Sequence, residues 1–221
     1  MDKRRVILWS LVALFSMMVC LVMVLSFAGA EAEKKVQVAI DPGHGGQDSG
    51  STYDGVEEKN LNLNIALYLA EELDNRGISY VMTREDDSFV ALGDRAYIAN
   101  DAKAELFISI HHNAIKNATS ANGTETLYYP NSAEDCKLSG EELASIVQRH
   151  LITELGTRDR GVISRPNLAV IRKTNMPACI AEIGYLSNAN ERGLLVSDNF
   201  QRLAAKALAN AIEEALGRIE E

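Results

Sequence analysis

Four ionisable positions stand at or just beyond the ends of predicted strands, where an α/β sheet builds its sites. They are His44, Glu58, the pair His111–His112, and Glu182. Two imidazoles and one carboxylate are a known ligand set for Zn²⁺, because three protein ligands leave the fourth tetrahedral position to a water that the metal acidifies. A further carboxylate can then serve as the base. This combination of residue types indicates a zinc-dependent hydrolytic centre.

Each of these positions also has an ordinary structural interpretation. His44 lies in a glycine-rich turn, and Glu58 near a helix start is a charge that the helix dipole favours. The combination favours chemistry, since three of the four histidines lie at strand ends and His150 alone falls on a predicted helix. The turn does not match either phosphate-binding fingerprint, and the polar loop 47–56 separates it from the next helix, so we set a phosphate cradle aside.

The elements that must position these residues follow from hydrophobic periodicity. Short apolar runs predict strands at 36–40, 78–83, 106–111, 124–129, 168–171 and 178–183. Helical spacing predicts helices at 92–102, 140–155 and 200–216, and one more that ends at Gly77. That helix carries one apolar stripe: Leu61, Ile65, Leu69 and Leu73. The alternation predicts right-handed crossovers and therefore a single three-layer α/β/α domain with a mostly parallel sheet, over residues 36–218.

The first 30 residues differ in composition from the rest of the chain. A basic start at residues 2–5 precedes an uncharged apolar stretch that ends in Ala28-Gly29-Ala30, the small-x-small pattern of a cleavage site. The stretch is also long enough to span a bilayer. Residues 1–30 are therefore predicted to be a signal peptide or an uncleaved membrane anchor, and both alternatives place the domain outside the cytoplasm.

The charge and cysteine content limit the possible partners. The chain has 221 residues, with 22 Lys and Arg against 31 Asp and Glu, a net charge of −9. This balance argues against nucleic-acid binding, which needs a cationic surface. We expect membrane contact only through the N-terminal segment, if it is uncleaved. Outside that segment Cys136 and Cys179 either form one disulfide or remain thiols.

Four sequence blocks, in order, resemble the signature blocks of the zinc-dependent N-acetylmuramoyl-L-alanine amidases of bacterial cell walls. They are DPGHGG at 41–46, EKNLNL at 58–63, SIHHNA at 109–114 and AEIGYLSN at 181–188. Arg84, Arg95 and Arg160 also look like family positions. The resemblance extends over most of residues 36–216.

The resemblance implies a role for each site residue. His44, Glu58 and His111 would bind Zn²⁺, and Glu182 would be the catalytic carboxylate. Glu58 is preferred to its neighbour because it precedes lysine, as in the family pattern. His112 departs from the pattern, which usually has a small residue there. Neighbouring residues on a strand point to opposite faces, so we expect His111 at the metal and His112 at the rim or in packing.

The implied activity is hydrolysis of the amide between N-acetylmuramic acid and L-alanine in peptidoglycan. Two alternatives stay open: a zinc peptidase acting on the stem peptides, and a non-catalytic cell-wall-binding regulator with the same fold. Some family members carry a long insert that covers the active site. Residues 114–139, which occupy this position here, are too few for such an insert, so we expect no segment of this kind to cover the site. The need for an activator protein stays open.

Overall fold

The structure is a computed structural model that describes residues 2, 9, 14–18, 35–130 and 136–220. The chain divides into two compact units, residues 1–34 and 35–221. Residues 9 and 14–18 of the first unit are helical, and most of the predicted signal or anchor lies outside the described residues. Of the helices within the described ranges, none combines the length and the apolar character needed to cross a membrane.

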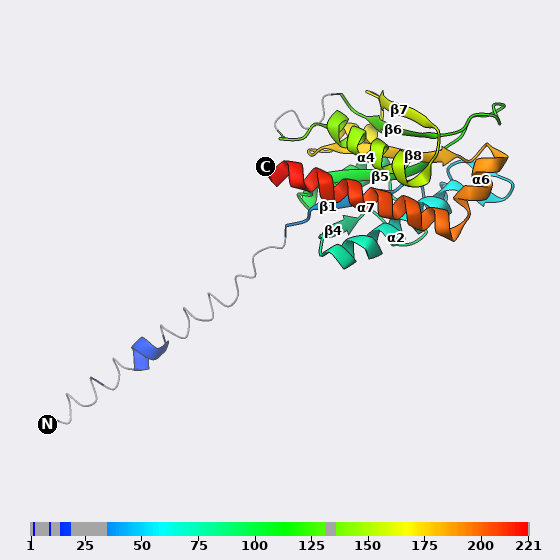
Figure 1. The fold of residues 1–221 in the computed structure, drawn as a ribbon. Coiled ribbons are helices and arrows are strands. Elements are labelled where there is room, and N and C mark those ends of the chain that lie inside the picture. Colours follow the sequence, from blue (N-terminus) through cyan, green and yellow to red (C-terminus); the bar gives the residue numbers. More distant parts are fainter. Residues whose placement is uncertain (1, 3–8, 10–13, 19–34, 131–135, 221) are drawn as a thin grey trace. The chain divides into compact units, whose positions relative to one another are not determined.

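The second unit is built around one six-stranded sheet with the order β4-β1-β5-β8-β6-β7 (Figure 1). Its strands are β1 (Val38–Pro42), β4 (Tyr80–Met82), β5 (Leu106–Asn113), β6 (Thr124–Tyr128), β7 (Asp159–Ser164) and β8 (Ala178–Tyr185). The β6–β8 pair is antiparallel, and the other four neighbouring pairs are parallel. The predicted mostly parallel sheet is confirmed.

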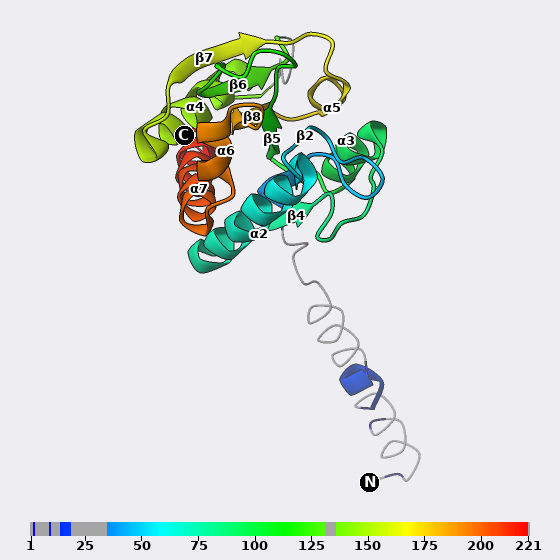
Figure 2. The ribbon, with the colours of Figure 1, turned by 90° about the vertical axis from the view of Figure 1, so that its right-hand side faces the viewer.

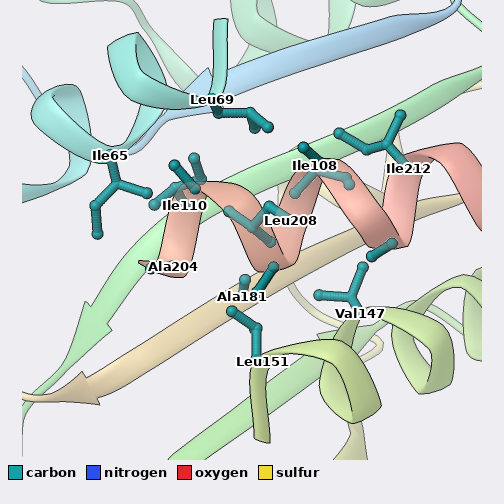
Figure 3. Close-up of a cluster of buried hydrophobic side chains, with 14 of the residues drawn as sticks. Ile65, Leu69, Ile108, Ile110, Val147, Leu151, Ala181, Ala204, Leu208 and Ile212 are labelled. Carbon is teal, nitrogen blue, oxygen red and sulfur yellow. The ribbon is translucent and has the colours of Figure 1, made fainter. Parts of the chain in front are cut away.

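Helices cover both faces of the sheet, which confirms the three layers. They are α2 (Glu58–Arg76), α3 (Leu92–Asp101), α4 (Gly140–Leu155), α5 (Ala169–Arg172), α6 (Ala189–Leu195) and α7 (Asp198–Glu220). Ile108 and Ile110 of β5 point toward α2, α4 and α7, and Figure 3 shows them packed among the side chains of these helices. Phe107 points to the opposite face and packs with residues of α3 and α5. This alternation is the period of two that a strand requires.

Helix ends coincide with capping residues that are visible in the sequence. Gly77, with a φ of 69°, ends α2, and Gly156, with a φ of 63°, ends α4. Ser139 and Glu142 form a capping box at the start of α4. These local interactions explain why the predicted ends at Gly77 and over 140–155 are confirmed.

The predicted strand 168–171 is wrong. This segment forms the one-turn helix α5, and the edge strand next to β6 is β7. A run of four apolar residues does not distinguish a strand from a buried helical turn. Val170 and Ile171 are buried in the cluster that contains Phe107, and a strand or a helical turn could place apolar side chains there. β7 was missed because it is a half-buried edge strand with few apolar residues.

A small hairpin begins within the segment predicted to be a loop at 47–56 and ends one residue beyond it. β2 (Thr52–Tyr53) and β3 (Val56–Glu57) pair antiparallel, and the turn between them is Asp54-Gly55. Both turn residues have positive φ, 50° and 76°, which is typical of the two-residue Asp-Gly turn. The hairpin leads directly into α2 and is therefore continuous with the candidate site.

Candidate active site

The carboxyl edge of the sheet brings the predicted ligands together. β1, β5 and β8 are adjacent and parallel, so the chain leaves all three at the same edge. His44 follows β1, His111 lies near the end of β5, and Glu58 is the first residue of α2. One ligand atom from each of the three lies within 4.8 Å of the others. The structure therefore places the predicted metal ligands in one cluster.

The Glu58 carboxylate is the centre of this cluster. Its Oε1 lies 3.0 Å from Nδ1 of His111 and 3.2 Å from Nε2 of His44. The backbone N–H groups of Ser51 and His112 donate to its Oε2 and Oε1, at 2.9 and 3.2 Å. Burial opposes ionisation, but the hydrogen bonds and charges of the two histidines outweigh it and hold the pKa of Glu58 well below its usual value. The Glu58 carboxylate is therefore ionised across the physiological pH range and can act as an anionic ligand.

The three residues fit a zinc ion. Two imidazole nitrogens and one carboxylate oxygen form a three-ligand set that leaves a position for water. Glu58 is buried, whereas His44 and His111 remain partly exposed. In this structure the two imidazole rings meet edge to face, with centroids 4.9 Å apart.

A second contact orients the His44 ring. Its Nδ1 lies 2.9 Å from Oδ2 of Asp48, which leaves Nε2 to face Glu58. Burial lowers the pKa of His44, but the hydrogen bonds and charges of Glu58 and Asp48 outweigh burial and raise it to about 9. A carboxylate on the distal nitrogen of a ligand histidine fixes its tautomer and raises its basicity. The sequence analysis missed Asp48, whose signal is an acid four residues after a histidine in a glycine-rich turn.

Two buried arginines hold the loop that carries His44. Arg84 donates to the carbonyls of Pro42, Gly43 and Lys59, each at 2.9 Å. Arg95 donates to the Asp41 carboxylate and to the carbonyls of Pro42 and His44, at 2.7–2.8 Å. Arg84 therefore joins the residues beside His44 to the residue after Glu58. Both arginines stand at positions that resemble the family.

Glu182 lies on the strand next to His111. It is the register partner of His111 across β5–β8 and of Glu125 across β6–β8, so the three side chains share one face of the sheet. Its Oε2 is buried and has no hydrogen-bond partner in the described part of the chain. Burial raises the pKa of Glu182 to about 7. A carboxyl group with this pKa exchanges protons readily near neutral pH.

His112 lies on the opposite face of β5 from His111 and packs beneath α2. It is buried, and its Nδ1 lies 2.8 Å from Oδ1 of Asn62. Burial is the main cause that lowers its pKa to about 4, so the ring is neutral. Of the two alternatives for His112, packing is confirmed and a place at the rim is wrong.

A buried group beside Glu182 was missed by the sequence analysis. Glu125 accepts a hydrogen bond from Asn113 at 2.8 Å and pairs with Arg160 at 3.0 Å. The Arg160 guanidinium also lies over the Tyr185 ring, 5.0 Å from its centroid. A charged residue inside a predicted buried strand was the available signal, because such a charge needs a partner.

The thiols are separate from the site. Cys179 is a buried thiol of β8 and Cys136 is exposed, so the structure does not adopt a disulfide between them. Burial raises the pKa of Cys179 well above its usual value. A thiol with this pKa is not ionised near neutrality and is chemically inert.

Comparisons with known proteins agree with this geometry. The N-acetylmuramoyl-L-alanine amidase family matches residues 38–214. The chain is 37% identical over 184 residues to the Bacillus subtilis protein YqiI, covering 83% of this chain and 86% of that protein. It is 38% identical over 171 residues to the N-acetylmuramoyl-L-alanine amidase LytC of the same organism, covering 77% of this chain and 34% of LytC.

The fold agrees as well. The crystal structure of the N-acetylmuramoyl-L-alanine amidase from Clostridium difficile 630 superposes with a TM-score of 0.77 at 36% sequence identity. The superposition covers 82% of this chain and 96% of that one. The family match over residues 38–214 runs from β1 into α7 and includes every residue of the candidate site. This chain therefore belongs to the N-acetylmuramoyl-L-alanine amidase family.

Proposed function

We propose that this chain cleaves the amide between the lactyl group of N-acetylmuramic acid and L-alanine in peptidoglycan, with Zn²⁺ held by His44, Glu58 and His111. The observation that carries the proposal is the convergence of these three ligands within 4.8 Å, with Glu182 on the adjacent strand. When bound, the ion supplies an acidified water and positive charge near the carbonyl oxygen of the substrate.

Glu182 performs the proton transfers in this proposal. Its carboxylate accepts the proton of the attacking water and then donates it to the amine of L-alanine as that amine leaves. The buried Oε2 has no competing hydrogen-bond partner among the described residues, so it is available for a water or an amine. Its raised pKa of about 7 supports this role, because such a carboxyl group can both accept and donate a proton near neutral pH.

Zinc is the metal that this donor set suits best. A mixed nitrogen and oxygen set of three ligands is typical of catalytic zinc. Asp48 contacts His44, and two backbone N–H groups donate to Glu58, so two of the three proposed ligands are fixed by a contact outside the ligand set. Ligands restrained in this way lose little freedom when a metal binds.

Product analysis tests the proposal. The full chain is incubated with bacterial peptidoglycan, with chelator, and with chelator followed by zinc, and the products are identified by mass. Release of stem peptides with a new amino group on L-alanine, abolished by chelator and restored by zinc, is expected. Release of D-alanine would support the peptidase alternative. Binding to the cell wall without cleavage, in protein that holds stoichiometric zinc, would support the regulator alternative.

We also propose that residues 1–30 are a signal peptide or membrane anchor and that the domain works outside the cytoplasm, where peptidoglycan lies. The basic start and the apolar stretch support this assignment. Cell fractionation with N-terminal sequencing tests it. A start near residue 31 in the secreted fraction indicates cleavage, an intact chain in the membrane fraction indicates an anchor, and an intact chain in the cytoplasm contradicts both.

A further inference from the structure

We propose that Arg192 binds a carboxylate of the stem peptide in a polar pocket beside the active site. The inference rests on the proposed function, because it names the part of that substrate which the pocket takes. The pocket is open to solvent and has a volume of about 650 Å³. Its lining is made mainly of hydroxyl, amide and charged side chains.

Three segments form the pocket, and each is continuous with an element of the candidate site. The hairpin tip at Tyr53 and Asp54 leads into α2, which begins with Glu58. Residues 119–122 belong to the connection that follows β5, the strand of His111. Residues 187–192 follow β8, the strand of Glu182. The pocket therefore lies at the carboxyl edge of the sheet, the side on which Figure 2 shows β2 and α6.

Hydrogen bonds hold two of these segments together. The Ile115 N–H donates to Oγ of Ser187 at 3.2 Å, and the Asn188 amide donates to the carbonyl of Ala121 at 3.1 Å. Asn188 also caps α6 by accepting the N–H groups of Asn190 and Glu191. This side of the pocket is formed before a ligand arrives, which lowers the entropic cost of binding.

Arg192 is the one cationic side chain among the described residues that line the pocket. Its Nη1 donates to the carbonyl of Leu186 at 3.0 Å, and its Nη2 pairs with Oδ2 of Asp54. A guanidinium carries five N–H donors, so these two contacts leave donors for a ligand. The Arg192 side chain is only 15% exposed, whereas Asp54 is 79% exposed at the tip of the hairpin.

The Asp54 carboxylate therefore occupies the position beside Arg192 that we assign to a carboxylate of the ligand. Asp54 itself is exposed at the hairpin tip, so its carboxylate can return to water when an incoming carboxylate replaces it on Arg192. The carbonyl of Leu186 continues to hold the guanidinium during this exchange. Arginine recognises carboxylates through two parallel hydrogen bonds, which adds specificity.

The charge of Arg192 distinguishes the two halves of the substrate. The lactyl carboxyl group of the glycan is consumed in the amide, so the intact glycan strand offers hydroxyl and acetamide groups without charge. The stem peptide carries free carboxylates. The hydroxyl and amide groups of the pocket suit the backbone of such a peptide, and Arg192 suits its charge.

Two opposite variants test the proposal. Both Arg192→Gln and Asp54→Asn break the same ion pair, so a purely structural role predicts similar effects from both. A binding role predicts opposite effects, because Asp54→Asn frees Arg192 for the ligand. Arg202→Gln is the matched control, since Arg202 lies on α7, pairs with Asp198 and does not line the pocket. Melting temperatures of all variants establish that each is folded.

Kinetics on two substrates provide the measurement. The full chain is assayed with an N-acetylmuramoyl tetrapeptide that has free carboxylates, and with the same compound fully amidated. Arg192→Gln is expected to raise KM for the acidic substrate about tenfold, the size of one charge-assisted hydrogen bond, with kcat little changed. Asp54→Asn is expected to lower that KM, because it removes the carboxylate that competes with the ligand for Arg192. Neither variant should alter KM for the amidated substrate.

Calorimetry measures binding of the free tetrapeptide, and this measurement separates the inference from the proposed function. Hydrolysis with the same KM in wild type and Arg192→Gln overturns the inference and leaves the amidase activity intact. Equal losses in both variants, on both substrates, also overturn it, since they indicate a structural ion pair. Peptide binding that depends on Arg192 without any hydrolysis supports the pocket and refutes the proposed function. Absence of both peptide binding and hydrolysis refutes both the inference about Arg192 and the proposed function.

Discussion

At the residue scale, the site depends on contacts that define each side chain's protonation. Glu58 is ionised because two histidines and two backbone N–H groups share its carboxylate. Glu182 has the opposite environment, since burial raises its pKa and its Oε2 has no partner in the described structure. Two carboxylates with opposite pKa shifts suit the two roles that we propose for them, Glu58 as a metal ligand and Glu182 as the proton carrier.

Replacement of Glu182 by Gln should remove turnover and keep the metal. The amide cannot accept a proton from water, so peptide release is expected to fall by about 10²- to 10⁴-fold. Zinc content should remain stoichiometric, because the amide replaces a group that is not a ligand. Peptide release measured by mass spectrometry and zinc measured by atomic absorption check this. Loss of zinc would instead place Glu182 among the ligands.

Asp48→Ala should weaken zinc binding. The substitution removes the carboxylate that orients the His44 ring, and losses of this kind typically cost about 10- to 100-fold in metal affinity. Competition with a chelator of known affinity measures the change. Asp101→Ala, an exposed position on α3, is the control and should bind zinc like the wild type. Unchanged affinity in Asp48→Ala would show that the ring is held without this contact.

At the element scale, the carboxyl edge of the sheet leaves little space between the loop after β1 and the end of β5. A Cβ added at Gly43 would lie 2.2 Å from Cε1 and Nε2 of His111. Arg84 and Arg95 hold the same loop through its carbonyls, so the loop has little freedom to move away. The glycine is therefore required by close approach to the ligand histidine.

Gly43→Ala should displace the His111 ring. We expect a loss of stability of about 1–3 kcal/mol, the usual range for an overpacked site, together with weaker zinc binding. Thermal unfolding and chelator competition measure the two effects. Gly93→Ala is the matched control, because an added Cβ there meets only Nζ of Lys173, at 3.8 Å. Equal behaviour of the two variants would contradict the steric argument.

At the scale of the whole molecule, ion pairs join helices that are distant in sequence. Glu214 of α7 pairs with Arg149 and His150 of α4, and with Arg218 of its own helix. The hydrogen bonds from Arg149 and His150 lower the pKa of Glu214 to about 2.

Glu214→Gln should destabilise the protein in a pH-dependent way. The folded-state pKa lies below the usual value near 4.5, so the contribution is present above that value and is lost as the pH falls toward 2. Exposed ion pairs are worth about 0.2–1 kcal/mol each, so the change in melting temperature is small. Thermal unfolding of variant and wild type should differ at pH 7 and converge near pH 2. A constant difference would show that lost packing is the cause.

The sequence by itself determined the features that depend on neighbouring residues. Helix ends at Gly77 and Gly156 and the capping box at Ser139 are local, and the alternation of strands and helices implies the parallel sheet. The four ordered blocks also identified the ligand candidates and Glu182. Local information was insufficient at 168–171, because four apolar residues suit either a strand or a helical turn.

Only the tertiary structure decided how distant residues meet. His44, Glu58 and His111 converge because adjacent parallel strands end at one edge and the hairpin brings the start of α2 beside them. The place of His112 beneath α2 and the pairing of Glu125 with Arg160 arise from contacts across elements. Such contacts depend on register and packing, and no sequence period encodes these. The pocket of Arg192 has the same origin, since three separate segments form it.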